Sequence, residues 1–458
     1  MSFQFTFDLN RCTGCQACVV GCWMENHAQQ AVNWRQVHTF NAQRHPDLPL
    51  FHLSLACHHC EDPACLNNCP ADAYTKDLAT GAVLIHAERC MGCRYCTWAC
   101  PHDAPKFNPS LGTIEKCTFC LERLREGLQP ACAARCPVEA LGFETATQEE
   151  RHHAIPGFPP SDLNPSIRFK PLRRAAGPEL GLVPAPSLVQ RFLLQTLAVS
   201  ERKITLRGEW SLALFTALMA VLVGWFTASL IGGPVLAPWV LLGLGMPAMV
   251  LSAWHLGRPS RAWRAVLHFR TSWLSREIAL VSAFLGLGGF SLLFFPGQKA
   301  LGWATALVGF LGLWAIDRIY RVALTGGKSS LHSGQALLNG SYLASILAAL
   351  PLLYVSLALL KAGLYLQRKW HFHGRGRPIH LAIGALRIVL GFLLPALVLR
   401  WNPLLAAFLA VLGDVVDRCE FYNELDVPSP QAELAAAFTL RSTKSNSPLR
   451  HENAETNR

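Results

Sequence analysis

Four groups of four cysteines lie in the first third of the chain, and cysteine thiolates are the usual ligands of iron–sulfur clusters. The first and third groups have the spacing C-x2-C-x2-C-x3-C, the second C-x2-C-x4-C-x3-C and the fourth C-x2-C-x11-C-x3-C. Proline follows the last cysteine of the second, third and fourth groups. The sixteen residues are Cys12, Cys15, Cys18, Cys22, Cys57, Cys60, Cys65, Cys69, Cys90, Cys93, Cys96, Cys100, Cys117, Cys120, Cys132 and Cys136. One binding unit is therefore repeated four times.

The spacing within each group favours a cubane cluster over a zinc ion. Three thiolates two residues apart can surround three iron atoms of one cubane, and the fourth, next to proline, points to the neighbouring cluster of a pair. Zinc is the weaker alternative, because it favours two C-x2-C pairs separated by a longer stretch. His58 and His59 lie between two cysteines of the second group, and we interpret them as polar filler rather than ligands. We expect four [4Fe–4S] clusters and no three-iron cluster.

The cysteines also indicate the redox environment of the first 150 residues. Sixteen of the 17 cysteines lie there, and only Cys419 lies outside. The first residues have neither the basic start nor the apolar core of a cleavable secretory signal, so we expect no such signal. Thiols inside a cell stay reduced, which favours metal ligands over disulfides.

Charge divides the chain into two unlike parts. Residues 1–150 have 11 Lys and Arg against 16 Asp and Glu, whereas the remainder has 30 against 14. The excess of arginine lies beside long apolar runs, which is typical of membrane topology and argues against a nucleic-acid partner. The acidic, cysteine-rich part argues against nucleic acid as well.

The apolar runs of the second part are long enough to cross a bilayer, which takes about 20 residues each. Tryptophans lie near the ends of most runs, where an indole ring prefers the membrane interface. A soluble helical bundle is the weaker alternative, because amphipathic surface helices are scarce between the runs. The expected spans are 210–231, 235–254, 278–296, 300–318, 336–360, 380–399 and 403–419.

Basic residues give the expected orientation. They precede the first span and fill the loop 255–277, so we expect both regions on the cytoplasmic side. With seven spans, the basic stretch 361–377 would lie on the opposite side. Division of the region 331–367 into two short spans would bring it back, so seven and eight spans both stay open. Export of the folded N-terminal part with a signal-bearing partner would reverse the whole orientation.

These patterns predict an α+β ferredoxin-like tandem 2[4Fe–4S] domain followed by an all-α polytopic membrane domain of seven or eight helices. The expected boundaries are a cluster domain at 1–150, a proline-rich linker at 151–208, a membrane domain at 209–426 and a polar, disordered tail at 427–458.

Two runs in the cluster domain identify a more specific relationship. They are CMGCRYCTWACP at 90–101 and KCTFCLERLREGLQPACAARCPVEAL at 116–141. This part resembles the four-cluster ferredoxin-type subunit of the dimethyl sulfoxide reductase family of molybdoenzymes. The resemblance implies that the first group pairs with the fourth and the second with the third, which spacing alone does not give. The implied ligand sets are Cys12, Cys15, Cys18 with Cys136; Cys117, Cys120, Cys132 with Cys22; Cys57, Cys60, Cys65 with Cys100; and Cys90, Cys93, Cys96 with Cys69.

The loop HLGRPSRAWRAVLHFRTSWLSRE at 255–277 resembles the membrane-anchor subunit of the same family, and the resemblance extends more weakly into the later spans. It implies that two subunits that are usually separate are fused here. It also implies that the anchor oxidises a quinol, for which we expect menaquinol, and that His255 and Glu277 form the quinol site.

The residues of this loop give an independent argument for the same site. His255 follows a tryptophan at a membrane boundary, where an imidazole can accept a proton near neutral pH. Glu277 begins the next span, where an ionisable group is costly unless it is used or paired. Arg258, Arg261 and Arg264 could orient a quinone head group, although anchoring the loop at the interface is the commoner role of such arginines.

The remaining ionisable residues in or near the spans are Asp317, Arg318, Arg321, Arg387 and Asp414, and we expect structural ion pairing rather than a proton path. A haem-carrying anchor would need histidines in the middle of spans. His332 and His380 lie at span edges, so we expect no haem.

We therefore predict the electron-transfer and membrane-anchor chain of a quinol-linked reductase in a bacterial inner membrane, with the cluster domain on the cytoplasmic face. Its expected partners are membrane lipid, the quinone pool and a separate molybdopterin-containing catalytic subunit, because the cluster domain leaves no room for that cofactor. The nearest alternative runs the same electron path in reverse, from a formate dehydrogenase or hydrogenase to quinone. A redox-driven ion transporter and a zinc-stabilised membrane module are weaker alternatives.

Overall fold

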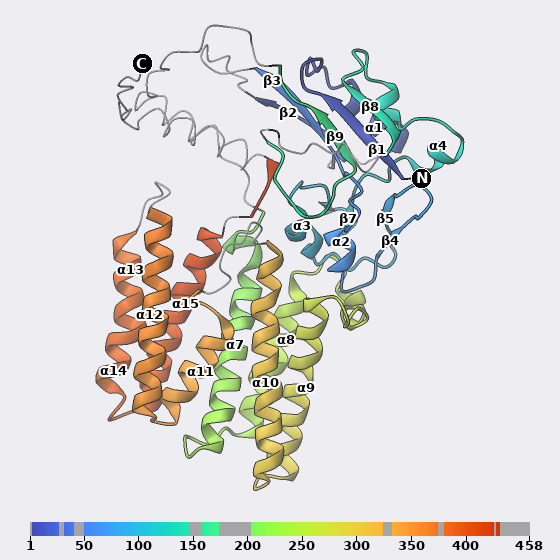
Figure 1. Ribbon diagram of the computed structural model, residues 1–458. Coiled ribbons are helices and arrows are strands. Elements are labelled where there is room, and N and C mark those ends of the chain that lie inside the picture. The colour runs from blue at the N-terminus through green and yellow to red at the C-terminus, as the bar shows by residue number, and fades with distance from the viewer. Residues whose placement is uncertain are drawn as a thin grey trace, which may run out of the picture.

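The computed structural model describes residues 2–26, 32–40, 50–146, 155, 157–173, 203–323, 332–373, 380–425 and 427–430. Short strands and helices gather at one end of a bundle of long helices (Figure 1). The expected order of a ferredoxin-like domain followed by a helical membrane domain is confirmed.

A three-stranded sheet organises the part of the cluster domain that lies far from the bundle. Its order is β8 (Leu141–Thr145), β1 (Phe3–Asp8), β9 (Ile167–Lys170), with β1 antiparallel to β8 and parallel to β9. Alternate side chains of β1 point inward, so that Phe5 and Phe7 are buried.

The third strand of this sheet changes the expected domain boundary. Phe158, Ile167 and Phe169 pack in the same core as Phe5 and Phe7. Residues up to Lys170 therefore belong to the cluster domain, although they lie in the expected linker at 151–208. The middle of that linker, at 174–202, and nearly all of the expected tail lie outside the described residues.

Three antiparallel hairpins and five short helices alternate with the loops that carry most of the cysteines; the cysteines within helices are Cys18, Cys22, Cys65, Cys96 and Cys132. The hairpins are β2 (Gln36–Phe40) with β3 (Phe51–Leu55), β4 (Tyr74–Lys76) with β5 (Val83–Ile85), and β6 (Lys106–Asn108) with β7 (Thr113–Glu115). The helices are α1 (Ala17–Asn26), α2 (Ala64–Asn67), α3 (Tyr95–Ala99), α4 (Leu121–Arg125) and α5 (Ala131–Ala134). Arg94 and Cys120 have left-handed backbones directly before α3 and α4. Figure 1 shows α2 and α3 next to the ends of the long helices, with α1 on the far side.

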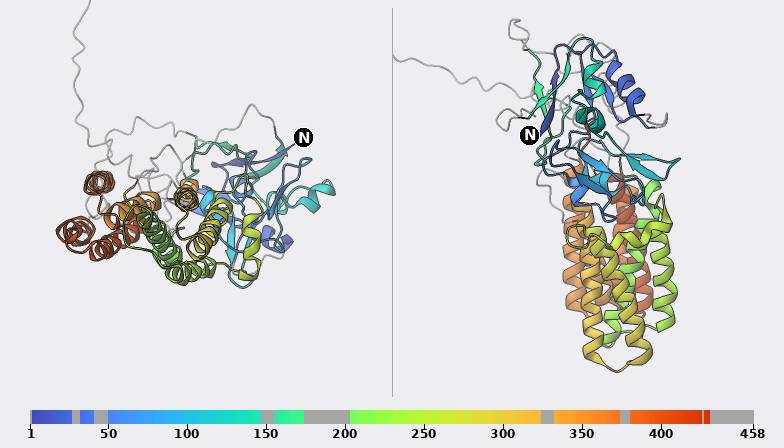
Figure 2. Two further views of the ribbon diagram at one scale, coloured as in Figure 1. Left: turned by 90° about the horizontal axis from the view of Figure 1, so that it is seen from below. Right: turned by 90° about the vertical axis from the view of Figure 1, so that its right-hand side faces the viewer.

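The bundle contains long helices that run roughly parallel to one another (Figure 2). Its elements are α7 (Leu206–Leu230), α8 (Pro238–Trp254), the 3-10 helix η2 (Pro259–Val266), α9 (Trp273–Phe294), α10 (Lys299–Ile319), η3 (Tyr320–Ala323), α11 (Ala336–Leu347), α12 (Pro351–His373), α13 (Leu381–Ile388), the π-helical η4 (Val389–Leu393), α14 (Leu394–Val398) and α15 (Pro403–Glu424).

The expected count of seven or eight spans is not confirmed by the lengths and hydropathy of the described helices. In the described residues, four helical stretches are long and apolar enough to cross a membrane: α7, α9, α10 and the stretch from α13 to α14. The count becomes five if α8 and η2, bent by 105°, form one span. The span expected at 336–360 is wrong, because the left-handed Ala349 and Pro351 divide it into α11 and α12.

Candidate functional site

Folding brings the sixteen cysteines of the cluster domain together in four sets, each with three residues from one group and one from another. We name them set 1 (Cys12, Cys15, Cys18, Cys136), set 2 (Cys57, Cys60, Cys65, Cys100), set 3 (Cys90, Cys93, Cys96, Cys69) and set 4 (Cys117, Cys120, Cys132, Cys22). Sets 1 and 2 each line a cavity. In sets 3 and 4 the thiols lie within electrostatic reach of one another. This is the interleaving that the resemblance implies, and all the cysteines are free thiols.

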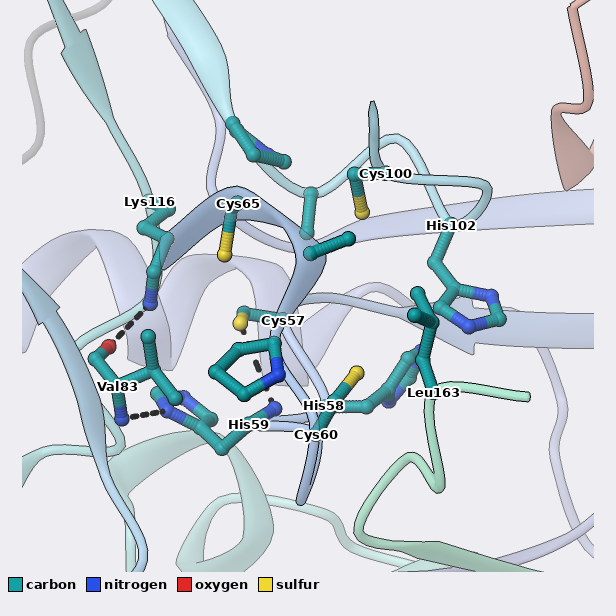
Figure 3. Close-up of a pocket in the computed structure, with 14 residues that line it drawn as sticks. Cys57, His58, His59, Cys60, Cys65, Val83, Cys100, His102, Lys116 and Leu163 are labelled. Atoms are coloured by element: carbon teal, nitrogen blue, oxygen red, sulfur yellow. Dashed lines mark hydrogen bonds between the residues drawn. The ribbon is translucent and has the colours of Figure 1, made fainter. Parts of the chain in front are cut away.

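Set 2 shows what these cavities can hold. Figure 3 shows the sulfur atoms of Cys57, Cys60, Cys65 and Cys100 around a common pocket. Over the described residues, no three or more His, Cys, Asp or Glu side chains are placed to hold a single metal ion. Four sulfur donors around a shared cavity fit a cubane, which needs one thiolate for each iron.

In each set at least one backbone amide donates to a sulfur atom. The donors include Leu141 to Cys136 at 3.4 Å, His59 to Cys57 at 3.5 Å, Ala73 to Cys69 at 3.4 Å and Phe119 to Cys117 at 3.4 Å. Hydrogen bonds to the sulfur ligands stabilise added negative charge and so influence cluster potentials. The repeated binding unit therefore includes backbone donors as well as the thiolates.

The two histidines of the second group have structural contacts. His59 Nδ1 accepts a hydrogen bond from the backbone N–H of Val83 at 2.9 Å, and its ring stacks on Phe119. Burial, reinforced by the nearby Lys116 ammonium, holds the pKa of His59 well below its ordinary value. The ring of His58 packs against Phe158. His59 is therefore a neutral acceptor that fixes the β5 backbone beside set 2.

The loop after α8 is bound to the backbone around set 3. Arg261 Nη1 donates to the carbonyl oxygen of Cys90 at 2.8 Å and to that of Ala87 at 2.6 Å. Arg258 Nε donates to the carbonyl oxygen of Leu111 at 2.8 Å. These two arginines thus join the membrane domain to the cluster domain, and their expected role toward a quinone stays a prediction. Arg264 lies over the ring of Trp263, 5.1 Å from its centroid.

Three glycines allow this close contact. Arg258 N donates to the carbonyl oxygen of Met91 at 3.0 Å, so the two backbones lie side by side. A Cβ atom on Gly92 or on Gly257 would overlap the carbonyl oxygen of Gly112. Gly92 and Gly112 also have left-handed backbones, with φ of 72° and 64°. The junction between the domains is therefore shaped for glycine at all three positions.

Two aromatic residues of set 3's own loop enter the bundle, and sequence analysis missed them. Tyr95 OH donates to the carbonyl oxygen of Ile319 at 3.2 Å. Trp98 stacks on Tyr320, with ring centroids 6.1 Å apart. Both belong to the largest buried core of the membrane domain. The sequence did contain a signal for this contact, namely bulky aromatic residues beside cluster ligands. A loop exposed to solvent does not need such side chains.

The expected quinol residues lie on either side of this aromatic contact. His255 is the C-terminal cap of α8 and lies half-buried within electrostatic reach of Arg94. Glu277 lies near the start of α9, is only 4% exposed, and faces Arg418 and Tyr95. Arg94 and Tyr95 lie between the set 3 ligands Cys93 and Cys96. The same short loop thus reaches the surroundings of both expected quinol residues.

Charged residues form a second buried group, the α12–α15 charge network. Lys361 Nζ and Arg387 Nη2 both contact Asp414 Oδ1, at 2.6 and 2.9 Å. Arg368 Nη2 contacts Asp417 Oδ1 at 2.7 Å. The members are Lys361, Arg368, Lys369, Arg387, Asp414, Asp417, Glu420 and Glu424. The expected structural pairing of Arg387 and Asp414 is therefore present.

The other polar residues that sequence analysis considered have separate roles. Asp317 accepts hydrogen bonds from the backbone N–H groups of Ala336 and Leu337, at 2.7 and 3.0 Å, and so caps α11. Arg318 lies over two tryptophan rings, and Arg321 is exposed. His332 is buried and stacks on Phe421, while His380 is an exposed cap of α13.

Two family models match the chain, one in each domain. Residues 49–146 match the 4Fe-4S dicluster domain, and residues 211–361 match the DMSO reductase anchor subunit. The second match begins within α7, includes α8 to α11 and the loop at 255–277, and ends within α12.

Curated relatives match up to about two fifths of the chain. A component of the anaerobic dimethyl sulfoxide reductase of Haemophilus influenzae is 35% identical over 187 residues, which span 38% of this chain and 91% of the relative. A component of the tetrathionate reductase of Salmonella typhimurium is 40% identical over 136 residues, 29% of this chain and 54% of the relative. The formate dehydrogenase-O iron-sulfur subunit of Escherichia coli is 33% identical over 154 residues, 30% of this chain and 51% of the relative.

Proposed function

Because the chain belongs to the dimethyl sulfoxide reductase family, in which it joins the iron–sulfur subunit to the anchor subunit, we propose that it carries electrons from membrane quinol to a separate catalytic subunit. Bound at the four cysteine sets, [4Fe–4S] clusters would supply one-electron carriers along this path. The observation that supports the proposal best is the entry of Tyr95 into the bundle beside Glu277. It links the expected quinol site to set 3 within one loop.

The chemistry at the membrane site is the oxidation of a quinol to a quinone, with loss of two electrons and two protons. The imidazole of His255 accepts one proton and the carboxylate of Glu277 the other. A cluster held by the cysteines of set 3 would accept the electrons one at a time. The buried position of Glu277 keeps water away from its carboxylate, and the Arg418 guanidinium lies within electrostatic reach of it.

The catalytic partner is a molybdopterin-containing subunit that docks on the cluster domain away from the membrane. The H. influenzae and S. typhimurium relatives are named as components of reductases, which supports a multi-subunit complex. We also propose that the bundle crosses the bacterial inner membrane eight times, since α11 and α12 are separate helices. The basic C-terminal end of α12 would then lie on the cytoplasmic face, together with the cluster domain and the loop at 255–277.

Electron flow in the opposite direction, from a formate-oxidising partner to quinone, is the second candidate. The similarity to a formate dehydrogenase iron-sulfur subunit favours it, although that match covers about half of the relative. The two directions need the same residues in this chain and differ in the partner.

The test is the rate at which a menaquinol analogue reduces the clusters of the complex, followed by absorbance and electron paramagnetic resonance. We expect His255→Ala and Glu277→Gln each to slow this reduction by about 10²-fold, which is typical for loss of a general base. Dithionite should reduce the variants as it reduces the wild type. His380→Ala, which removes an exposed histidine from the cap of α13, is the matched control. Reduction at the wild-type rate in both site variants would reject the quinol site.

A further inference from the structure

The four cysteine sets adjoin one another in a definite order. Cys18 of set 1 and Cys22 of set 4 lie on the same helix, α1. Cys117 of set 4 and Cys57 of set 2 share one small buried core. Cys65 of set 2 and Cys69 of set 3 both lie within electrostatic reach of the Tyr74 hydroxyl. Contact therefore runs from set 1 to set 4, then to set 2, and then to set 3 beside the bundle.

A buried lysine occupies the junction between sets 4 and 2. The Lys116 side chain is 1% exposed, and its Nζ donates to the carbonyl oxygens of Val83 and Cys117, the latter at 2.9 Å. Figure 3 shows this ammonium at the wall of the set 2 pocket, beside the sulfur atoms of Cys57 and Cys65. A lysine carries a full positive charge at neutral pH, and burial leaves that charge little screened.

A buried arginine occupies the junction between sets 1 and 4. Arg35 is 2% exposed, and its Nη1 donates to Ser54 Oγ at 3.1 Å. Ser54 Oγ in turn lies 3.3 Å from Cys18 Sγ of set 1. On its other side the guanidinium contacts Cys132 of set 4. The ring of Phe5 lies below the guanidinium, 4.9 Å away, and shields it from water.

The third junction has a neutral residue. Tyr74 is 4% exposed and lies between sets 2 and 3, with Cys96, Cys65 and Cys69 as its sulfur neighbours. A phenol carries no charge at neutral pH. Of the three residues that occupy these junctions, the two cations therefore lie at the junctions that involve set 4. A further buried cation, Lys203, lies beside set 2 and donates to the carbonyl oxygen of Cys100 at 2.6 Å.

We propose that Lys116 and Arg35 are positioning residues that raise the reduction potentials of the clusters on either side of them. Reduction adds a negative charge to a cluster, and a buried cation a short distance away stabilises that charge strongly in a low-dielectric interior. Set 4 touches both cations, so its potential is raised by both. The proposal rests on the proposed function, because it requires clusters at these cysteines.

The two cations predict different patterns in a redox titration. Lys116→Gln keeps a donor for the Val83 and Cys117 carbonyls but removes the charge, and should lower the midpoint potentials of sets 2 and 4. Arg35→Gln should lower those of sets 1 and 4. Set 4 responds to both substitutions and set 3 to neither. The double variant should shift set 4 by about the sum of the two single shifts.

The experiment is a mediated redox titration of the whole complex, monitored by electron paramagnetic resonance, with each signal assigned by the Cys→Ser variant that alters it. Lys76→Gln is the matched control, since this half-exposed lysine donates to the set 2 backbone at Cys60, where water screens its charge. Lys116→Arg, which keeps the charge, should restore the wild-type potentials.

Iron content separates the possible failures. Variants that keep about sixteen irons per chain but show unshifted potentials, or equal shifts in all four sets, would overturn the inference and leave the proposed function intact. A wild-type complex without these irons would instead refute the proposed function. If Lys116→Gln loses iron, Arg35→Gln still tests the pattern at sets 1 and 4.

Discussion

Arg261 Nη1 lies 2.8 Å from the carbonyl oxygen of Cys90, so a side chain of the membrane anchor holds the backbone of a cluster ligand. The same guanidinium also binds the carbonyl oxygen of Ala87. In a complex of separate subunits such a contact would form across an interface. Here the contact lies within one chain. The distance between the loop at 255–277 and set 3 is therefore fixed by the covalent connection and by hydrogen bonds together.

Loss of this contact should loosen the junction without removing the cluster. We expect Arg261→Ala to lower the free energy of unfolding by about 1–3 kcal/mol, because two hydrogen bonds to a charged donor are lost at a partly exposed site. Quinol-dependent reduction of set 3 should slow while its iron is retained. Thermal unfolding in detergent and stopped-flow reduction measure the two effects. Arg270→Ala, at an exposed position in the same loop, is the control.

Substitution at the glycine junction should be more damaging. In Gly257→Ala the new Cβ would overlap the carbonyl oxygen of Gly112, and both partners are backbone, so neither can rotate away. We expect a loss of about 1–3 kcal/mol in the free energy of unfolding, as for overpacked cores. Gly243→Ala in α8 meets no atom within 4 Å and should be neutral or slightly stabilising. Equal melting temperatures for the two variants would contradict the close backbone contact.

The π-helical turn of the membrane domain should be equally intolerant of a side chain. Gly391 lies where Arg387 passes toward Asp414, and a Cβ there would overlap Arg387 Nη1. We expect Gly391→Ala to displace the guanidinium and lower the melting temperature in detergent. Gly363→Ala in α12 has open space around it and serves as the control. If the Gly391→Ala variant were as stable as this control, Arg387 could leave its position without lowering the melting temperature.

Neutralising Asp414 in the α12–α15 charge network should leave Lys361 without its carboxylate partner and Arg387 with Asp417 alone, at 3.4 Å. Asp414→Asn removes the charge that Lys361 and Arg387 share. We expect a loss of about 3–5 kcal/mol in the free energy of unfolding, which is typical for breaking a buried ion pair. The double variant Asp414→Asn with Lys361→Met should recover part of that loss. Chemical unfolding in detergent measures both, and a single variant as stable as wild type would reject a structural role for the network.

Cysteine spacing along the chain is enough to predict four metal-binding units, because each unit is a short loop whose ligands are close in sequence. Apolar runs likewise predict most of the membrane helices, since every buried backbone must form its own hydrogen bonds in lipid. The loop at 255–277 could be singled out from its basic and ionisable residues, and from its resemblance to the anchor subunits.

Other features depend on contacts between residues far apart in the chain. Arg35 directly precedes β2 and Lys116 directly follows β7, and nothing in their neighbours along the chain shows that each lies between two cysteine sets. The role of Tyr95 depends on its hydrogen bond to Ile319, which lies more than two hundred residues away in the chain. The pairing of β9 with β1 places the end of the cluster domain later in the chain than the sequence predicts. The left-handed backbone of Ala349 divides an apolar run that hydropathy alone cannot divide. The local sequence pattern determines which secondary-structure elements form, because hydrogen bonding and the periodicity of apolar residues act over a few residues. Packing alone decides which charges and rings meet, because those contacts join residues that lie from about twenty to more than two hundred positions apart in the chain.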